Sequence, residues 1–464
     1  MNILIKQIEY IEKVKPFVES KYGKNATFTV VTFGCQMNAK DSERLAGMLT
    51  AMGFKNIDDE QKADVVLFNT CTVRENANER LYGRIGQLKQ SYNNNKNKII
   101  GICGCMMQEK DEVELIQKKY PYVKLIFGTY NIYELPSLMY ELLQNEKKVI
   151  SVYDKPVDIE ENLPSDRKYS FKCGINIMYG CNNFCSYCIV PYVRGRERSR
   201  KQEDILNEIK QVVNDGVVEV MLLGQNVNSY GNDLSDENKI RFPELLSKVC
   251  DIEGLKRVRF MTSHPKDFSD ELIEVMKTHN KICRQVHLPV QSGSNEILKK
   301  MNRKYTREHY LSLIEKIKKD LPDVSLSTDI IVGFPEESEK DFEDTLDLIE
   351  KVNFDNVFTF KYSKRTGTKA ATMDGQVDEK VVDERFDRLL KLTRNLSSNN
   401  CDKFVRKTVE VLVEDVEKEK NLLVGRMSNN TLVYFEGEKE LIGKLINVKI
   451  DKSFGFYLTG NIYL

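Results

Sequence analysis

Three cysteines, Cys181, Cys185 and Cys188, lie within the eight-residue stretch CNNFCSYC. Thiolates at this spacing can hold one corner of a [4Fe–4S] cluster, and three ligands leave one iron open for a small molecule. The alternative is a zinc site, which prefers four closed ligands. The four histidines of the chain all lie beyond residue 260, far from the trio in sequence. The spacing therefore favours an iron–sulfur cluster over zinc.

A second set of cysteines is spread over the first part of the chain. Cys35 lies in FGCQMN, Cys71 in NTCTVRE and Cys105 in GCMMQ, each just after an expected strand. Buried cysteines are often small hydrophobes, but parallel strands end on one sheet edge, so three thiols at equivalent strand ends favour a shared metal site. Cys103 leaves an alternative open, because residues i and i+2 of a strand point the same way.

The elements that would position the second set form an α/β series. We expect a helical leader over residues 1–24 and an α/β domain over 25–145. Its strands are TFTVVTF, ADVVLFNT, IIGICGC and KLIFG. Strands that alternate with helices predict a parallel sheet. We expect a polar loop at SYNNNKNK, residues 91–98, and a linker over 146–166.

The first cysteine trio follows the first strand of a longer series, over residues 167–397. Its expected strands are CGINIMYG, VVEVMLLG, RVRFMTS, QVHLPV, VSLSTDIIVG and NVFTFKYS. Six β/α repeats predict a partial (β/α)6 barrel with active groups at the carboxyl ends of the strands. Ser338 is expected to cap a helix that buries Phe342, Leu346 and Ile349. Short strands over residues 400–464 predict a small antiparallel β-barrel.

Composition indicates a globular protein of several domains. Of 464 residues, 41% are hydrophobic, and 70 basic residues balance 70 acidic ones. We find no stretch near the roughly 20 apolar residues of a membrane helix, so we expect a cytoplasmic protein. Disulfides are improbable there, and clustered cysteines then indicate metal or redox chemistry. The remaining cysteines have no companion motif and are expected to be structural: Cys173, Cys250, Cys283 and Cys401.

A basic run follows the cluster motif, at Arg194, Arg196, Arg198 and Arg200. Its place beside the expected active site predicts contact with RNA phosphates, and a solvated surface is the alternative. Aromatic residues of the last domain, such as Tyr434, Phe454 and Phe456, could stack on bases or could form core.

The cysteine motifs resemble a known family. CNNFCSYC matches the Cys-x-x-x-Cys-x-x-Cys motif of the radical S-adenosylmethionine superfamily. FGCQMNAKDSE, NTCTVRENANERLYGRIGQLK, YVRGRERSR and LLGQNVNSYG resemble the methylthiotransferases, and most closely the MiaB-type tRNA methylthiotransferases. The resemblance covers the chain from about residue 26. It implies a methylthiotransferase domain, a radical core and a TRAM domain.

The resemblance also implies ligands. Cys181, Cys185 and Cys188 would hold the cluster that binds S-adenosylmethionine. Cys35, Cys71 and Cys105 would hold an auxiliary [4Fe–4S] cluster, and the family motif selects Cys105 over Cys103.

Further cofactor contacts are implied less directly. Gln225 and Asn226 lie in the segment that would face the methionine amine. Asp329 and Gly333 lie in DIIVGFPE, where Asp329 replaces the first glycine of the superfamily pattern. Ser292, in QSGS, is a further candidate, with a surface turn as the alternative.

The implied activity is conversion of N6-isopentenyladenosine to its 2-methylthio derivative at position 37 of tRNA. Carbon 2 of adenine has no acidic proton, so a radical route is needed, with a cofactor carrying the hard step. One S-adenosylmethionine would methylate sulfur and another would yield the 5′-deoxyadenosyl radical. The implied partners are a tRNA anticodon stem–loop and an electron donor such as flavodoxin or ferredoxin, and we expect a monomer.

Two rival functions remain at the level of sequence. Related enzymes methylthiolate threonylcarbamoyl-adenosine or a ribosomal-protein aspartate. From a different class, a non-catalytic RNA-binding protein with structural zinc would also contain clustered cysteines.

Overall fold

The computed structural model describes residues 3–72, 75–156, 159–235, 239–417 and 419–463. The chain forms two compact units, and each is described by itself. Unit 1 contains Met1–Tyr169, Tyr179–Asn182 and Ile189–Arg200, and unit 2 contains Ser170–Met178, Asn183–Cys188 and Lys201–Leu464.

Unit 1 is built on a six-stranded sheet of order β2-β1-β3-β4-β5-β6, in which all pairings are parallel. Its strands are β1 (Thr27–Thr32), β2 (Lys55–Asn56), β3 (Val65–Thr70), β4 (Ile99–Gly104), β5 (Leu125–Phe127) and β6 (Val149–Ser151). The parallel sheet is confirmed. The linker assignment is wrong at β6, which pairs with β5 and so extends the sheet into residues expected to be a linker.

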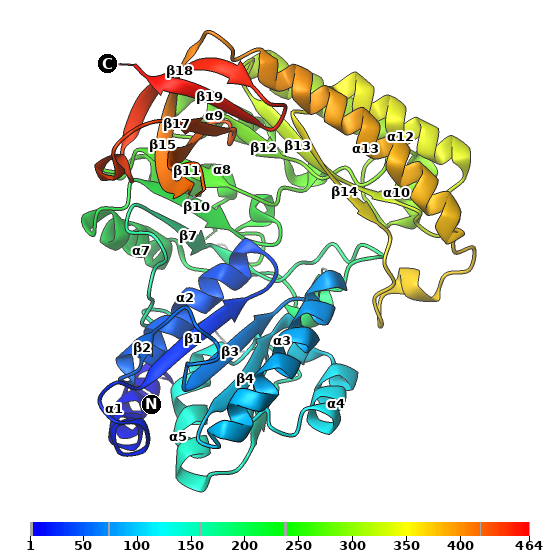
Figure 1. Ribbon diagram of the computed structural model, residues 1–464. Coiled ribbons are helices and arrows are strands. Elements are labelled where there is room, and N and C mark those ends of the chain that lie inside the picture. Colours follow the sequence, from blue (N-terminus) through cyan, green and yellow to red (C-terminus); the bar gives the residue numbers. More distant parts are fainter. Residues whose placement is uncertain (1–2, 73–74, 157–158, 236–238, 418, 464) are drawn as a thin grey trace. The chain divides into compact units, whose positions relative to one another are not determined.

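Helices cover both faces of this sheet, and its strands are therefore buried on both sides (Figure 1). Val65 and Leu67 pack with α1 (Ile3–Tyr22), α2 (Gln36–Ala51) and α5 (Leu135–Asn145). Val66 and Phe68 pack with α3 (Glu75–Asn94) and α4 (Lys110–Lys119). The expected leader is therefore a helix, and its residues Ile11, Val14 and Val18 belong to the core of unit 1, whereas Ile5 and Ile8 are exposed.

The expected loop at 91–98 begins later than predicted, because α3 continues to Asn94. The Ser91 hydroxyl donates a hydrogen bond to the Gln61 carbonyl at 2.9 Å, which supports the last helical turn.

Unit 2 contains the partial barrel. Two parallel sheets, β7-β10-β11 and β12-β13-β14, are joined by a parallel bridge between Val258 and Ile282. The six strands are β7 (Lys172–Asn176), β10 (Glu219–Leu223), β11 (Arg257–Phe260), β12 (Gln285–His287), β13 (Ser325–Val332) and β14 (Asn356–Lys361). All six expected strands, and with them the partial (β/α)6 barrel, are confirmed.

The helices that follow these strands are α7 (Gln202–Asn214), α8 (Phe242–Cys250), α9 (Asp270–Thr278), α10 (Asn295–Lys300), α11 (Arg307–Asp320), α12 (Glu339–Val352) and α13 (Glu379–Asp402). Shorter elements lie near the cysteine motif: β8 (Met178–Tyr179), α6 (Val190–Val193) and β9 (Arg198–Ser199).

Helix α12 begins as the sequence predicts. Ser338 accepts a hydrogen bond from the Asp341 backbone N–H, and Asp341 bonds back to the Ser338 N–H, which forms a capping box. Phe342 and Ile349 are buried as expected, but Leu346 is only partly buried and Leu348 lies in the core. The buried stripe is therefore turned slightly around the helix from its predicted position.

The last part of unit 2 is a closed five-stranded barrel of order β15-β16-β17-β19-β18. Its strands are β15 (Thr408–Glu417), β16 (Leu422–Met427), β17 (Leu432–Phe435), β18 (Leu445–Ser453) and β19 (Tyr457–Ile462). The small barrel is confirmed; β17 and β19 pair in parallel, and the other pairings are antiparallel. Buried arginines of β11 attach it: Arg257 donates to the Arg426 carbonyl and Arg259 to the Met427 carbonyl.

None of the helices in the described residues has the length and apolar character needed to cross a bilayer.

Replacement of the cap of α12 tests its local stability. Ser338→Ala removes the side-chain acceptor at the helix start and should cost about 1 kcal/mol locally. We expect roughly fivefold faster amide hydrogen exchange in the first turn of α12, measured by mass spectrometry. Ser312→Ala, at an exposed position inside α11, is the matched control and should leave exchange unchanged. Equal exchange in the two variants would show that the cap contributes nothing.

Candidate cluster and cofactor sites

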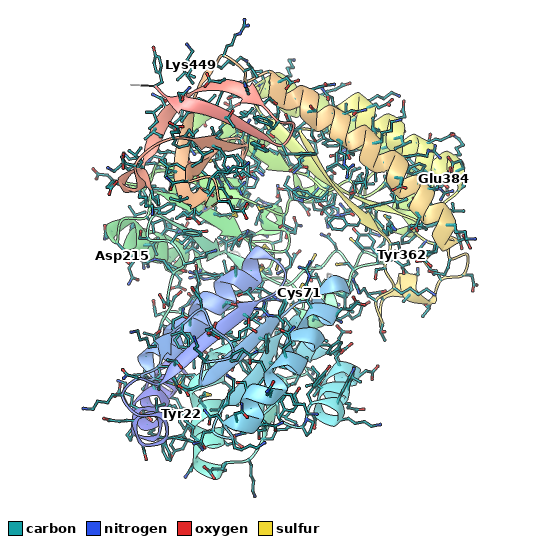
Figure 2. The ribbon with its side chains drawn as sticks, viewed as in Figure 1. Tyr22, Cys71, Asp215, Tyr362, Glu384 and Lys449 are labelled. Atoms are coloured by element: carbon teal, nitrogen blue, oxygen red, sulfur yellow. The ribbon has the colours of Figure 1, made fainter. Side chains whose placement is uncertain are left out.

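The three cysteines of unit 1 follow three adjacent strands. Cys35 is the N-cap residue of α2 after β1, Cys71 directly follows β3 (Figure 2), and Cys105 begins a 3₁₀ turn after β4. Gly34 makes the close approach of two of these loops possible. Its φ is +106°, and a Cβ there would lie 2.4 Å from the Cys71 Cβ. The sheet therefore gathers the three loops at one edge, as the sequence predicts.

The side chain of Asn38 lies between these loops and is fully buried. Its Nδ2 donates hydrogen bonds to the carbonyls of Phe33, at 2.8 Å, and of Thr70, at 2.7 Å. Its Oδ1 lies 4.0 Å from the Cys35 Sγ and 3.9 Å from the Cys105 Sγ. One amide thus contacts the loops after β1, β3 and β4.

Arg194 completes this cluster and is itself 5% exposed. Its Nε lies 3.2 Å from the Cys105 Sγ, and its Nη2 donates to Asn38 Oδ1 at 2.6 Å and to Asp41 Oδ2 at 2.8 Å. Burial raises the pKa of the Cys105 thiol to about 12, and the positive charge of Arg194 opposes that rise. Removal of one partner from a buried ion pair of this kind costs about 3–5 kcal/mol.

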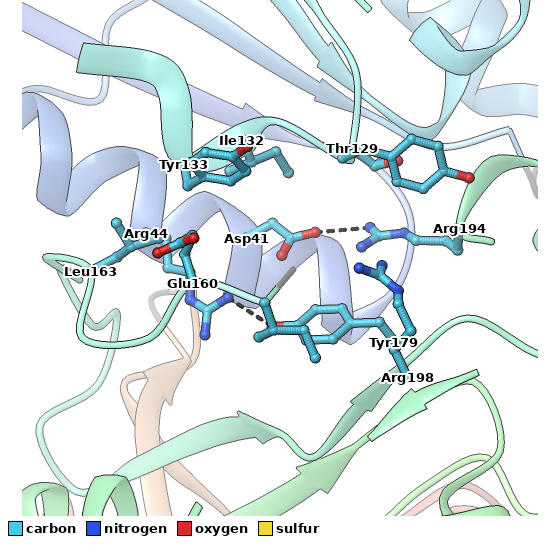
Figure 3. A pocket seen from close by; sticks show the side chains of 12 residues that line it. Asp41, Arg44, Thr129, Ile132, Tyr133, Glu160, Leu163, Tyr179, Arg194 and Arg198 are labelled. Carbon is cyan, nitrogen blue, oxygen red and sulfur yellow. Dashed lines mark hydrogen bonds and ion pairs between the residues drawn. The ribbon is translucent and has the colours of Figure 1, made fainter. Parts of the chain in front are cut away.

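The burial of Arg194 corrects one sequence expectation. The sequence predicts that its guanidinium contacts RNA phosphates, but in the structure the guanidinium contacts Cys105, Asn38 and Asp41 inside unit 1. Arg194 and Asp41 also line a cavity of about 60 Å³, together with Arg44, Tyr179 and Arg198 (Figure 3).

The structure separates Cys103 from Cys105. Cys103 lies within β4 and packs in the apolar core against α1, α2 and α5, where burial raises its thiol pKa. Gly104, with φ +97°, breaks the strand alternation, and Cys105 packs instead near Ile189 and Val193. From sequence alone Cys103 and Cys105 cannot be told apart, because regular strand alternation through Gly104 would point both thiols the same way. The conformation of Gly104 ends that alternation.

The residues of unit 1 fit an iron–sulfur cluster. Cys35 and Cys105 share one neighbour, Asn38, and Cys71 lies against Gly34. Three thiols with a nearby cation form a donor set that such clusters take. In the parts of the chain that the structure describes, no three His, Cys, Asp or Glu side chains already form a complete metal-binding group. The ligand assignment therefore stays a proposal that rests on the convergence of the loops.

The motif CNNFCSYC follows β7. Cys181 belongs to unit 1, where its N–H donates to the Gly195 carbonyl at 3.0 Å. Cys185 and Cys188 belong to unit 2 and are joined by a turn in which the Cys188 N–H donates to the Cys185 carbonyl at 2.9 Å. Phe184 adopts φ +46°, a left-handed conformation that is uncommon for a bulky residue and marks a tightly constrained loop.

A buried arginine also contacts a thiol of this motif. Arg303 Nη1 lies 3.6 Å from the Cys185 Sγ, and its other nitrogens donate to the Tyr305 hydroxyl and the Pro289 carbonyl. The loop is further fixed by the Ser186 N–H, which donates to the Met301 carbonyl at 3.0 Å. Sequence reasoning did not identify Arg303, because it lies far from the motif in the chain.

Buried polar atoms collect beyond the carboxyl ends of the barrel strands. Within the described residues, these atoms have no hydrogen-bond partner: Asn226 Oδ1 and both Asn228 side-chain atoms after β10, Ser263 Oγ after β11, and Tyr362 OH after β14. Buried polar groups normally form hydrogen bonds, so these atoms are suited to bind a polar ligand. This end of the partial barrel therefore fits a polar cofactor such as S-adenosylmethionine.

The expected cofactor residues have different positions in unit 2. Gln225 and Asn226 follow β10, and Asn226 Nδ2 donates to Asp267 at 2.7 Å. Asp329 lies in β13 with an oxygen 3.5 Å from His287 Nε2. Gly333 ends that strand with φ +76°, and a Cβ there would lie 2.4 Å from Val382, so glycine is required by the turn.

Ser292 is not in a surface turn, and contact with the cofactor stays a prediction. It is fully buried, which excludes the surface turn, and its hydroxyl contacts Thr345 Oγ1 at 3.3 Å and accepts from the Ser294 N–H at 3.2 Å. These bonds join the loop to α12 and indicate a structural role.

The basic run is mostly folded into unit 1. Arg200 is 2% exposed and pairs with Glu161 at 2.5 Å, and Arg198 lies over the Tyr179 ring, with 5.8 Å from its Cζ to the centroid. Arg196 is exposed. The expectation of RNA contact is therefore wrong for Arg194 and Arg200, whose charges are neutralised internally.

The four remaining cysteines lie in or against core. Cys173 and Cys250 belong to the barrel core, Cys283 is buried beside it, and Cys401 packs partly against the small barrel. Burial raises the thiol pKa of Cys250 to about 12 and of Cys283 and Cys401 to about 11, which keeps them protonated and unreactive.

Three family models match the chain. They are "Uncharacterized protein family UPF0004" at residues 27–128, "Radical SAM superfamily" at 175–349 and "TRAM domain" at 402–463. Among solved structures, a cobalamin-bound radical S-adenosylmethionine methyltransferase from Kitasatospora setae is similar, with TM-score 0.53 and 14% identity over 75% of this chain and 74% of that one. At that identity the likeness concerns the fold alone.

Curated relatives match over nearly their full length. A tRNA-2-methylthio-N(6)-dimethylallyladenosine synthase from Lachnoclostridium phytofermentans is 57% identical over 96% of this chain and 97% of its own. Proteins with the same name from a Thermoanaerobacter species and from Clostridium tetani are each 52% identical, over 97% and 96% of this chain and 96% and 98% of theirs. With its three domains and these relatives, the chain belongs to the tRNA-2-methylthio-N(6)-dimethylallyladenosine synthase family of radical S-adenosylmethionine enzymes.

Proposed function

We propose that this protein is a tRNA methylthiotransferase that converts N6-isopentenyladenosine to 2-methylthio-N6-isopentenyladenosine at position 37. The observation that carries the proposal is the presence of two cysteine trios, one after three adjacent parallel strands and one in a single loop, in a chain 57% identical to a named synthase. The radical S-adenosylmethionine domain supplies one [4Fe–4S] cluster and its cofactor. The second cluster, on Cys35, Cys71 and Cys105, is part of the proposal.

When bound, S-adenosylmethionine at the first cluster supplies the 5′-deoxyadenosyl radical, a second S-adenosylmethionine supplies the methyl group, and the auxiliary cluster supplies the sulfur. The chain's own residues bind and orient these groups. Cys181, Cys185 and Cys188 would hold the first cluster, and Arg303 would place a positive charge beside it. The unpaired oxygens of Asn226 and Ser263 offer acceptors for the cofactor's ammonium or ribose hydroxyls.

The small barrel offers a surface for the RNA. Phe454 and Phe456 are 51% and 59% exposed, so they are surface residues and not core. Phe454 stacks on Tyr457 with centroids 4.9 Å apart, and Tyr434 meets the same ring edge-on. Exposed aromatic clusters of this kind stack on unpaired bases such as those of an anticodon loop. In unit 1, Arg196 is the exposed member of the basic run and is the candidate for phosphate contact.

The remaining expectations complete the proposal. The enzyme would work as a cytoplasmic monomer and would receive electrons from a small carrier such as flavodoxin or ferredoxin. Its substrate would be the anticodon stem–loop of tRNAs that already carry the isopentenyl group.

Loss of the enzyme should change one nucleoside. In tRNA from a strain that lacks this gene, 2-methylthio-N6-isopentenyladenosine should fall below detection while N6-isopentenyladenosine accumulates, as measured by liquid chromatography and mass spectrometry. Complementation with the intact gene is the control. Unchanged levels of both nucleosides, or loss of a methylthiolated threonylcarbamoyl-adenosine instead, would refute the proposed substrate.

Single cysteine variants should separate the two sites. Cys185→Ala should abolish reductive cleavage of S-adenosylmethionine, because the first cluster loses a ligand. Cys71→Ala should still form 5′-deoxyadenosine but should insert no sulfur. Cys250→Ala, in the barrel core, is the control and should retain both activities. Deoxyadenosine formation by Cys185→Ala, or full methylthiolation by Cys71→Ala, would contradict the assignment.

A further inference from the structure

Two buried side chains other than the cysteines, Asn38 and Arg194, connect all three loops of the auxiliary site. Asn38 Nδ2 donates hydrogen bonds to the carbonyls of Phe33 and Thr70, which lie just before Cys35 and Cys71 in the chain. Arg194 binds Asn38 and the Cys105 thiol. Each of the three cysteine loops is therefore tied to the same pair of buried side chains.

The position of Arg194 is itself fixed by unit 1. The Thr129 hydroxyl donates to the Val193 carbonyl at 2.8 Å, and Val193 packs beside Cys105. Asp41, one turn along α2 from Asn38, accepts from Arg194 Nη2 at 2.8 Å. The planar guanidinium thus has separate partners for Nε and Nη2, which the single ammonium of a lysine cannot reproduce.

The positive charge of Arg194 would also affect the reduction potential of a cluster at this site. Three cysteine thiolates bring negative charge into a buried site, and reduction of a cluster there adds one more electron. A buried cation with an N–H directed at a ligand sulfur stabilises the reduced form more than the oxidised form. Arg194 is the cation in contact with a thiol of this set.

We propose that Asn38 and Arg194 are positioning residues for the auxiliary cluster, in which Asn38 preorganises the three cysteine loops and Arg194, through its hydrogen bond to Cys105, sets the reduction potential. The inference rests on the proposed cluster ligands. The two roles can be tested separately, because Asn38 would affect assembly of the cluster and Arg194 would affect its reduction potential.

The test uses the full-length chain with Cys181→Ala, Cys185→Ala and Cys188→Ala, so that only the auxiliary site can bind a cluster. After anaerobic reconstitution, iron and acid-labile sulfide are counted, and the midpoint potential is measured by titration followed by electron paramagnetic resonance. In this background we compare Asn38→Ala, Arg194→Gln, Arg194→Lys and the control Arg196→Gln, which changes an exposed arginine of the same segment. Circular dichroism verifies that each variant is folded.

We expect Asn38→Ala to retain less than half of the iron of the parent. Arg194→Gln should retain a cluster whose midpoint potential is more negative, and Arg194→Lys should show a smaller shift because the charge remains. Arg196→Gln should match the parent in both measurements. A merely structural ion pair would alter folding but not the potential of a fully loaded cluster.

Two results would overturn the inference. One is parental iron content in folded Asn38→Ala, and the other is a parental potential in folded, loaded Arg194→Gln. A fifth change, Cys105→Ala in the same background, separates this failure from that of the proposed function. If Cys105→Ala also keeps a complete cluster, Cys105 is not a ligand and the ligand assignment is wrong. If Cys105→Ala loses the cluster, the ligand assignment stands and only the roles proposed for Asn38 and Arg194 are refuted.

Discussion

The constraint on which this molecule depends is that parallel strands all end at one edge of their sheet. In unit 1 it brings together Cys35, Cys71 and Cys105, which are spread over seventy residues of sequence. In unit 2 it places polar side chains that follow β10, β11 and β14, such as Asn226 and Ser263, beyond the carboxyl ends of the barrel strands. The gathering of the three cysteines of unit 1 and of the polar side chains of unit 2 follows from the same topological rule.

Burial of thiols beside a cation is the second shared feature. Arg194 contacts Cys105 and Arg303 contacts Cys185, and both guanidiniums are buried. Their other partners differ. Arg194 also pairs with the Asp41 carboxylate, whereas Arg303 donates to the neutral Tyr305 hydroxyl and Pro289 carbonyl. Among the described residues, Arg303 therefore has no carboxylate within hydrogen-bond distance comparable to the Asp41 partner of Arg194.

Much of this architecture was predictable because it depends on local patterns. Buried strands such as VVLFNT, the Ser338 cap and the cysteine spacing can all be read from short stretches. What could not be predicted depends on long-range packing. Arg194 resembles the exposed Arg196 in sequence and differs only because Asp41 and Asn38 face it across the fold. Likewise, only the φ of Gly104 separates Cys103 from Cys105, and β6 becomes a strand only because β5 is available to pair with it.

The central claim is that the two cysteine trios hold separate [4Fe–4S] clusters. Mössbauer spectroscopy with iron quantification on anaerobically reconstituted protein tests it most directly. We predict about eight irons per chain in the wild type and about four in each of two variants, one lacking Cys35, Cys71 and Cys105 and the other lacking Cys181, Cys185 and Cys188. About four irons in the wild type, with one variant unchanged, or stoichiometric zinc in place of iron, would contradict the account.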